Sequence, residues 1–178
     1  MTYYGSKDLA RSFRQVRTNT LQIANEIPEE KYGFNASPET RTIGQTLAHI
    51  ALAPRVQTHV HQNRFTDAAI VPWGELIMGV AAEETKPRTK AEVIALLNTE
   101  GESFANYLES LGDDFLSEPV TMPSYLQPAA KSRFEMLMSP KEHEMHHRGQ
   151  LMMLQRMIGQ VPHLTRQMLE RMAPAAKA

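Results

Sequence analysis

The residues with the clearest potential for chemistry are three histidines. His143 and His147 are four positions apart, and His49 lies much earlier in the chain. Residues four apart lie on one face of an α-helix, so the first two imidazoles would point in the same direction. The chain has no cysteine, so a metal site must use His, Asp or Glu, and neutral imidazole is the commonest metal ligand. The pair therefore indicates part of a divalent metal site.

The position of each histidine within its helix supports this interpretation. At about 100° per residue from His143, His147 falls near 40° and Leu154 near 20° on the helical wheel, inside the apolar stripe that the helix must bury. An uncompensated buried polar group costs on the order of 1–3 kcal/mol, and a metal ion would compensate both rings. His49 occupies an inward position on an earlier helix. Three ligands from two helices would leave one or two positions for water or substrate, as in catalytic sites.

Other interpretations of the same residues stay open. The segment HEMHH, residues 143–147, mimics the HExxH zinc motif, in which Glu144 would be a general base near the edge of the cavity. Gln150 falls near the histidine stripe at about −20°, where it could orient a ligand or cap a buried polar group. A single histidine on an apolar stripe is more often a core residue than a ligand. No catalytic residue is assigned.

Apolar residues at helical spacing predict the elements that must position these groups. Ser6 is the expected first N-cap, and capping boxes begin helices at Thr42 and Thr89. Pro54 predicts a kink near Ala53 or an early helix end, and Pro140 predicts either a kink or a fresh helix start with Ser139 as its N-cap. The expected long helices cover residues 6–27, 42–63, 89–111 and 132–158, and a short fifth helix covers 165–172.

The connecting segments predict how the helices are joined. Three connecting segments contain Pro, in two of them together with Gly, and are expected to be irregular: residues 29–41, 65–87 and 113–128. In the second segment, Trp73 and a short apolar piece at 76–80 could cover the mouth of the metal cavity. No segment alternates strictly over the length of a strand. The sequence thus predicts an all-α fold, a four-helix bundle with long crossover connections and a short C-terminal helix. We expect one domain over residues 1–178, with a flexible tail at 173–178.

Composition excludes several classes of function. Lys and Arg number 19 against 20 Asp and Glu, so there is no global bias toward nucleic acid or anionic membranes. No apolar run approaches the roughly 18 residues needed to cross a bilayer, and the first residues carry charges where a signal peptide would be apolar. These features predict a cytoplasmic protein without nucleic-acid or membrane partners.

Two blocks of sequence resemble the DinB-like family of metal-binding four-helix bundles. The blocks are TIGQTLAHI at residues 42–50 and HEMHHRGQL at 143–151, the second followed by MIGQVP at 157–162. The resemblance implies that His49, His143 and His147 bind a divalent ion such as nickel or zinc, and that His146 is not a ligand. It also implies a homodimer and a bundle with a long crossover.

The resemblance implies several possible activities. Some relatives are thiol-dependent S-transferases or isomerases that use low-molecular-weight thiols such as bacillithiol or mycothiol, and others are proposed metal-dependent hydrolases. We expect a transferase that acts on a small electrophilic molecule. The alternatives are a metal-dependent hydrolase, with Glu144 or Glu142 as the base, and a non-enzymatic, stress-related metal-binding protein with a closed site.

Overall fold

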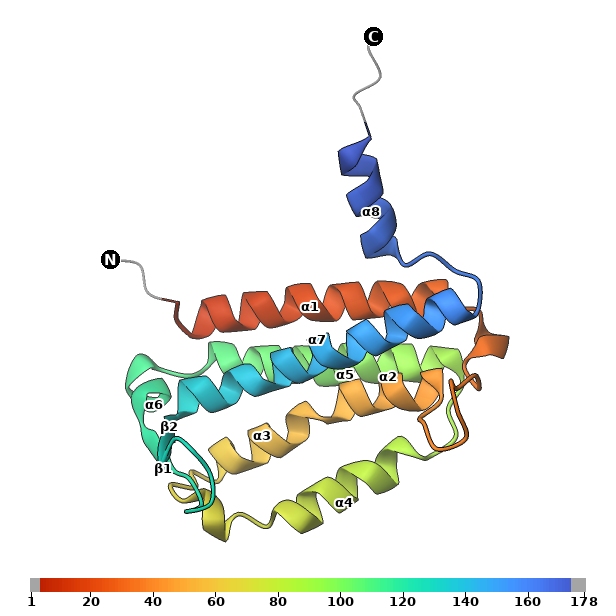
Figure 1. Ribbon diagram of the computed structural model, residues 1–178. Helices are drawn as coiled ribbons and strands as arrows, with labels where there is room; N and C mark the ends of the chain where they lie inside the picture. The colour runs from red at the N-terminus through yellow and green to blue at the C-terminus, as the bar shows by residue number, and fades with distance from the viewer. Residues whose placement is uncertain (1–3, 174–178) are drawn as a thin grey trace.

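The computed structural model describes residues 4–173, and most of them are helical (Figure 1). The α-helices are α1 (Ser6–Glu26), α2 (Ile43–Leu52), α3 (Pro54–Gln62), α4 (Trp73–Glu84), α5 (Lys90–Glu109), α6 (Asp113–Ser117), α7 (Arg133–Met157) and α8 (His163–Met172). Two short 3₁₀ helices, η1 (Glu29–Lys31) and η2 (Ala68–Ile70), lie in the connections. Of the expected flexible tail, all but residue 173 lies outside the described residues.

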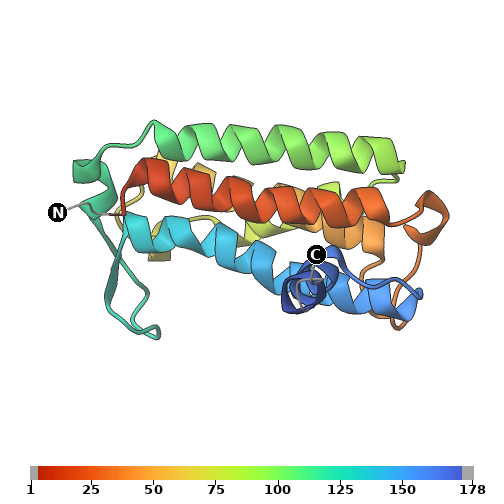
Figure 2. The same ribbon diagram turned by 90° about the horizontal axis from the view of Figure 1, so that it is seen from above.

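Four long rods form the bundle: α1, the consecutive pair α2 and α3, α5, and α7 (Figures 1 and 2). α1 packs against α5 and α7, and α2 also packs against α5 and α7. The first two rods in the sequence, α1 and α2–α3, are therefore diagonal to each other in the bundle rather than adjacent. This arrangement confirms the predicted bundle with crossover connections, and it makes α2 and α7 adjacent.

The helix starts follow the predicted capping chemistry at three positions. The Thr42 hydroxyl accepts from the Gln45 N–H at 3.2 Å, Thr89 does the same for Glu92, and Ser132 caps α7. Ser6 is not the N-cap of α1, because Gly5 takes that position and the Asp8 carboxylate accepts from its N–H.

The two internal prolines have different effects on their helices. Pro54 divides the second rod, since α2 ends at Leu52 and α3 begins at Pro54. Ala53, between them, keeps a helical backbone. Pro140 does not divide α7, which is one helix from Arg133 to Met157. The fresh helix start considered at Ser139 is therefore wrong.

Two expectations about the connections are also wrong. Residues 73–84 form the helix α4, which packs along α2 and α3 on the outside of the bundle, where an irregular segment was expected. Strands β1 (Pro119–Thr121) and β2 (Ala130–Ser132) form an antiparallel pair, in which Val120 lies opposite Lys131. Three-residue strands are too short for alternation to reveal them. Gly112 caps α6, and α5 already ends at Glu109.

The core lies between the four rods, with one cluster around Leu47, Leu97 and Leu151 and another around Phe13 and Leu108 at the other end.

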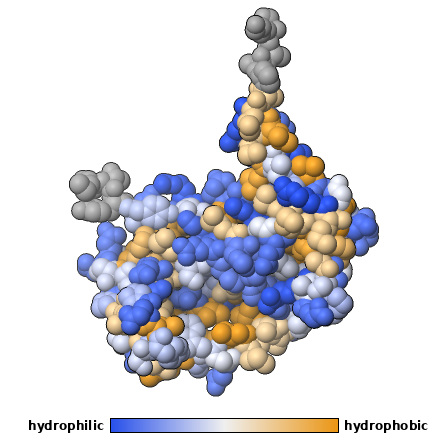
Figure 3. All heavy atoms as spheres, in the orientation of Figure 1, coloured by the Kyte–Doolittle hydropathy of each residue, from blue (hydrophilic) through white to orange (hydrophobic). Residues whose placement is uncertain are grey.

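α8 stands clear of the bundle, and its apolar residues Met168, Leu169 and Met172 are exposed (Figure 3). Among the described residues, no helix combines the length and apolar character that a membrane crossing requires.

Candidate metal centre

Three imidazole rings from two helices meet in the interior of the bundle. His49 lies near the end of α2, and His143 and His147 lie one turn apart on α7. The Nε2 atom of His143 is 3.1 Å from Nε2 of His49 and 3.1 Å from Nε2 of His147. One ring nitrogen from each residue lies within 4.8 Å of the other two. The structure thus brings together the three histidines singled out in the sequence, and we call them the three-histidine cluster.

Partners on the other ring nitrogens fix the orientation of two of the rings. His49 Nδ1 is 2.7 Å from Glu84 Oε2, and a carboxylate only accepts, so this nitrogen carries the hydrogen. His147 Nδ1 donates in the same way to Gln150 Oε1 at 2.8 Å, while the Gln150 amide donates to His146. In the neutral tautomers of His49 and His147, each Nε2 therefore carries a free lone pair that is directed at His143.

This arrangement cannot be satisfied by the protein alone. His143 Nε2 can donate a single hydrogen, and two lone pairs face it. His143 Nδ1 is buried and has no hydrogen-bond partner in the described part of the chain. Two nitrogens held about 2.05 Å from a tetrahedral ion lie about 3.3 Å apart, close to the 3.1 Å from His143 Nε2 to each of the other two Nε2 atoms. The donor set fits a divalent ion, and the His49–Glu84 contact has the form of the outer carboxylate that orients metal-binding histidines.

Burial sets the protonation of the cluster. It lowers the pKa of His49 and of His147, and the contacts to Glu84 and Gln150 only partly oppose this shift. The pKa of His143 falls to about 4, because burial is reinforced by the neighbouring imidazoles. The rings are consequently neutral near pH 7, and neutral imidazole is the form that binds metal.

Glu144 does not reach the cluster, although it was a candidate base. Its carboxylate is buried on another side of α7, where it accepts from Arg17 Nε at 3.0 Å and from Arg17 Nη2 at 2.9 Å. Arg17 also donates to the backbone oxygens of Leu97 and Ile50. Glu142 is exposed and lines a different surface pocket. The HExxH interpretation is therefore unsupported by the geometry.

Two residues beside the cluster were missed in the sequence. Glu84, at the end of α4, contacts His49, and the Arg41 Nε donates to the other oxygen of Glu84 at 2.8 Å. The sequence did contain a signal that Glu84 lies on a helix. The segment that ends at this residue has helical spacing at positions 73, 76, 77, 80, 81 and 84. Gly74 and Gly79 obscured it, since glycine disfavours helices.

Three further histidines lie away from the cluster. His61 is buried at the end of α3, where its Nδ1 accepts from Arg133 Nη1 at 3.2 Å. His163 is buried at the start of α8. His59 lies near the aromatic ring of Phe65. None of these belongs to the cluster.

Two cavities reach the three-histidine cluster. The small cavity, about 230 Å³, is lined by His49 and His143, and its other walls come from α3, α4 and α7. The large cavity, about 700 Å³, is lined by His147 and Gln150, together with residues 36 and 39–41 and the end of α7. Arg41 and Glu84 line both cavities. The cluster is therefore accessible from two directions.

Solved structures share this fold. YfiT from Bacillus subtilis, described as a probable metal-dependent hydrolase with an unusual four-helix bundle topology, matches with a TM-score of 0.68 at 15% identity, over 90% of this chain and 91% of that chain. A DinB-like protein from Bacillus cereus matches with a TM-score of 0.67 at 17% identity, over 90% of this chain and 97% of that one. At these identities the likeness establishes the fold alone.

Sequence comparison assigns the family. No functionally curated protein matches the chain significantly. The profile of the DinB superfamily matches residues 12–151, a span that includes all three histidines of the cluster. Because this match covers most of the 178 residues, the chain belongs to the DinB superfamily.

Proposed function

We propose that the protein is a metal-dependent transferase that joins a low-molecular-weight thiol to a small electrophile at the three-histidine cluster. The observation that carries the proposal is the access to the cluster from two cavities. A transfer reaction needs two organic reactants to meet at one point, whereas hydrolysis needs one reactant and water.

The metal would be held by the Nε2 atoms of His49, His143 and His147. Nickel and zinc both accept imidazole ligands. A divalent ion bound there supplies Lewis acidity, which favours the deprotonated form of a thiol or water near neutral pH. Glu84 and Gln150 hold the rings of His49 and His147 in the required tautomers.

Both cavities have mainly apolar surfaces, but the large one has more polar surface, and this difference suggests which reactant each cavity takes. The large cavity has polar groups from Thr40, Thr46 and Gln150, which suit a polar thiol. The small cavity has less polar surface, which suits an electrophile with an apolar body. In the reaction, sulfur forms a bond to an electrophilic carbon and the thiol loses its proton. With an aryl halide, the halide departs with the electron pair of the broken bond. With an epoxide or an activated alkene, the electron pair of the broken C–O or π bond stays on the product, which takes up a proton.

The experiment is a reaction screen. Protein loaded with zinc or nickel is incubated with bacillithiol, mycothiol, glutathione or cysteine and a panel of aryl halides, epoxides and activated alkenes. We expect S-conjugates, detected by mass spectrometry, that require both metal and protein and disappear in the His143→Ala variant. A complete panel without turnover, despite bound metal, would contradict the transferase proposal.

The likeness to YfiT supports metal-dependent hydrolysis as a second candidate. This reaction needs a base beside the cluster, and Glu84 is the carboxylate there. Both of its oxygens are engaged, one by His49 and the other by Arg41, which weakens the case. Turnover of esters or amides without any thiol would favour hydrolysis. A closed, non-enzymatic site fits less well, because two cavities reach the cluster. The homodimer implied by the family resemblance stays a prediction.

A further inference from the structure

The guanidinium of Arg41 is a charged group beside the cluster that the protein leaves partly unused. Its Nε donates to Glu84, and its remaining N–H groups have no partner among residues 4–173. The side chain is 43% exposed and lines the small cavity with His49 and His143. A planar guanidinium with free N–H groups suits a carboxylate, which can accept two parallel hydrogen bonds.

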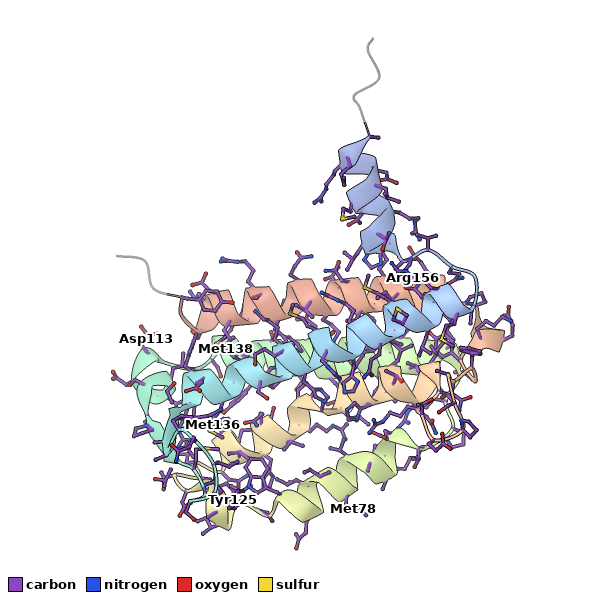
Figure 4. The ribbon with its side chains drawn as sticks, in the orientation of Figure 1. Met78, Asp113, Tyr125, Met136, Met138 and Arg156 are labelled. Atoms are coloured by element: carbon purple, nitrogen blue, oxygen red, sulfur yellow. The ribbon has the colours of Figure 1, made fainter. Side chains whose placement is uncertain are left out.

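The rest of the small cavity is mostly apolar. Its walls include Ala53, Val56, Ile77, Val80, Ala81 and Pro140. Ile77 is exposed to solvent, although it is a large apolar residue in this wall. Met78, next to it on α4, points away from the bundle instead (Figure 4). The walls therefore offer an apolar body a surface that the protein itself does not cover.

Charge adds a second condition on the ligand. Glu84 is the acidic residue that lines the small cavity, and Arg41 balances its charge. Imidazole binds a metal in its neutral form, so a divalent ion held by the three rings would leave the site with a net positive charge. A positive site with low-dielectric walls attracts an anion more strongly than a neutral molecule.

We propose that the small cavity binds a small apolar carboxylate, with its head group held by Arg41 and its apolar body against α3 and α4. This inference rests on the proposed function, because the carboxylate would be the electrophilic reactant. The volume of about 230 Å³ lies below the ~300–1,000 Å³ of drug-sized pockets, so the ligand must be small.

The test is calorimetric binding to zinc-saturated protein, without thiol and without turnover. The probes are phenylacetate, its neutral counterpart phenylacetamide, and acetate, which lacks the apolar body. We expect phenylacetate to bind more tightly than both of the others. Arg41→Gln should weaken phenylacetate binding about tenfold or more, as for loss of a charge-assisted hydrogen bond, and should change phenylacetamide binding little.

Matched variants test each half of the proposal. Ala81→Phe fills the small cavity and should weaken both aromatic probes, whereas Ala82→Phe, exposed on the same helix, should not. Arg11→Gln removes the same charge on the exposed side of α1 and should leave phenylacetate binding unchanged.

Three outcomes would overturn the proposal. Acetate and phenylacetate could bind equally with no effect of Arg41→Gln, which would mean that the ion alone holds the carboxylate. Phenylacetamide could bind as well as phenylacetate, which would remove the need for an anion. Ala81→Phe could have no effect, which would remove the cavity. Since none of these results depends on a thiol, failure of the transferase screen would be seen separately.

Discussion

His143 and Glu144 are neighbours on α7, yet their side chains lie in buried polar clusters of opposite character. Glu144 belongs to an ion pair with Arg17 in which every guanidinium nitrogen has a partner, and neither of the two cavities at the histidines is lined by either residue. Gly101 makes room for the Arg17 side chain, because a Cβ at position 101 would lie 3.0 Å from Arg17 Cγ. His143 belongs to a cluster with an unpartnered nitrogen, converging lone pairs and two cavities.

The difference shows how a buried polar group can be assigned a role. A satisfied pair such as Arg17–Glu144 holds helices together, since it links α7 to α1 and to the backbone of α2 and α5. Groups that the protein leaves unsatisfied in its interior carry a cost of about 1–3 kcal/mol, which a ligand can remove. The three-histidine cluster is such an unsatisfied group, so it is a candidate ligand site.

The largest expected effect concerns the satisfied pair. Arg17→Met should destabilise the metal-free protein by about 3–5 kcal/mol, because it leaves the Glu144 carboxylate buried without its partner. Urea unfolding followed by circular dichroism measures the loss. The double variant Arg17→Met, Glu144→Leu should recover most of the stability, since both charges are gone. If Arg17→Met lowered the free energy of unfolding by less than about 1 kcal/mol, the Arg17–Glu144 pair would not be a structural ion pair.

Removing a ring from the three-histidine cluster should strongly reduce metal binding and should change the stability of the metal-free protein little. His143→Ala should weaken zinc binding well over 100-fold, more than the ~10–100-fold lost with an outer partner. The metal-free variant should stay helical and within about 1 kcal/mol of the parent, because the lost ring was not satisfied. Calorimetry and urea unfolding measure the two effects. A variant that bound zinc like the parent would end the metal assignment.

His61 provides an intermediate case, with one ring nitrogen bonded to Arg133 and the other unpartnered in the described structure. Burial, reinforced by Arg133, lowers the pKa of His61 from 6.5 to about 4. Between these values the unfolded chain binds the proton and the folded protein does not, so stability falls as the pH is lowered from 6.5 toward 4.

The contribution of His61 to this fall should be about 2–3 kcal/mol. His61→Gln, which keeps an acceptor for Arg133, should make the free energy of unfolding less dependent on pH in that window. Urea titrations at several pH values measure the slope. An unchanged slope would show that His61 titrates normally in the folded protein.

The smallest expected effect concerns the partner of His49. Glu84→Gln should weaken zinc binding about 10–100-fold, because the ring loses its charged acceptor. Glu83→Gln is the matched control, since Glu83 is paired with Lys86 and Arg88 and does not contact the cluster. Equal zinc affinities for the two variants would show that Glu84 does not act through His49.

The local features of the helices could be predicted from sequence because they depend on nearby residues. The capping boxes at Thr42 and Thr89 and the apolar stripe of α7 specify helices that the structure confirms. The spacing of His143 and His147 placed both rings on one face, and an inward position identified His49. α4 was missed because its two glycines weakened a periodic pattern that was nevertheless present.

The meeting of groups that are distant in the chain depended on tertiary structure. Helical spacing placed Glu144 about 100° from His143, but only the packing of α1 against α7 shows that Arg17 occupies that side. Likewise, Arg41 and Glu84 reach His49 because the crossover connections carry the loop before α2 and the end of α4 to the same place. The sequence alone determined which faces of the helices are buried, since burial follows periodicity. Which buried groups face one another was decided by helix order, which periodicity does not encode.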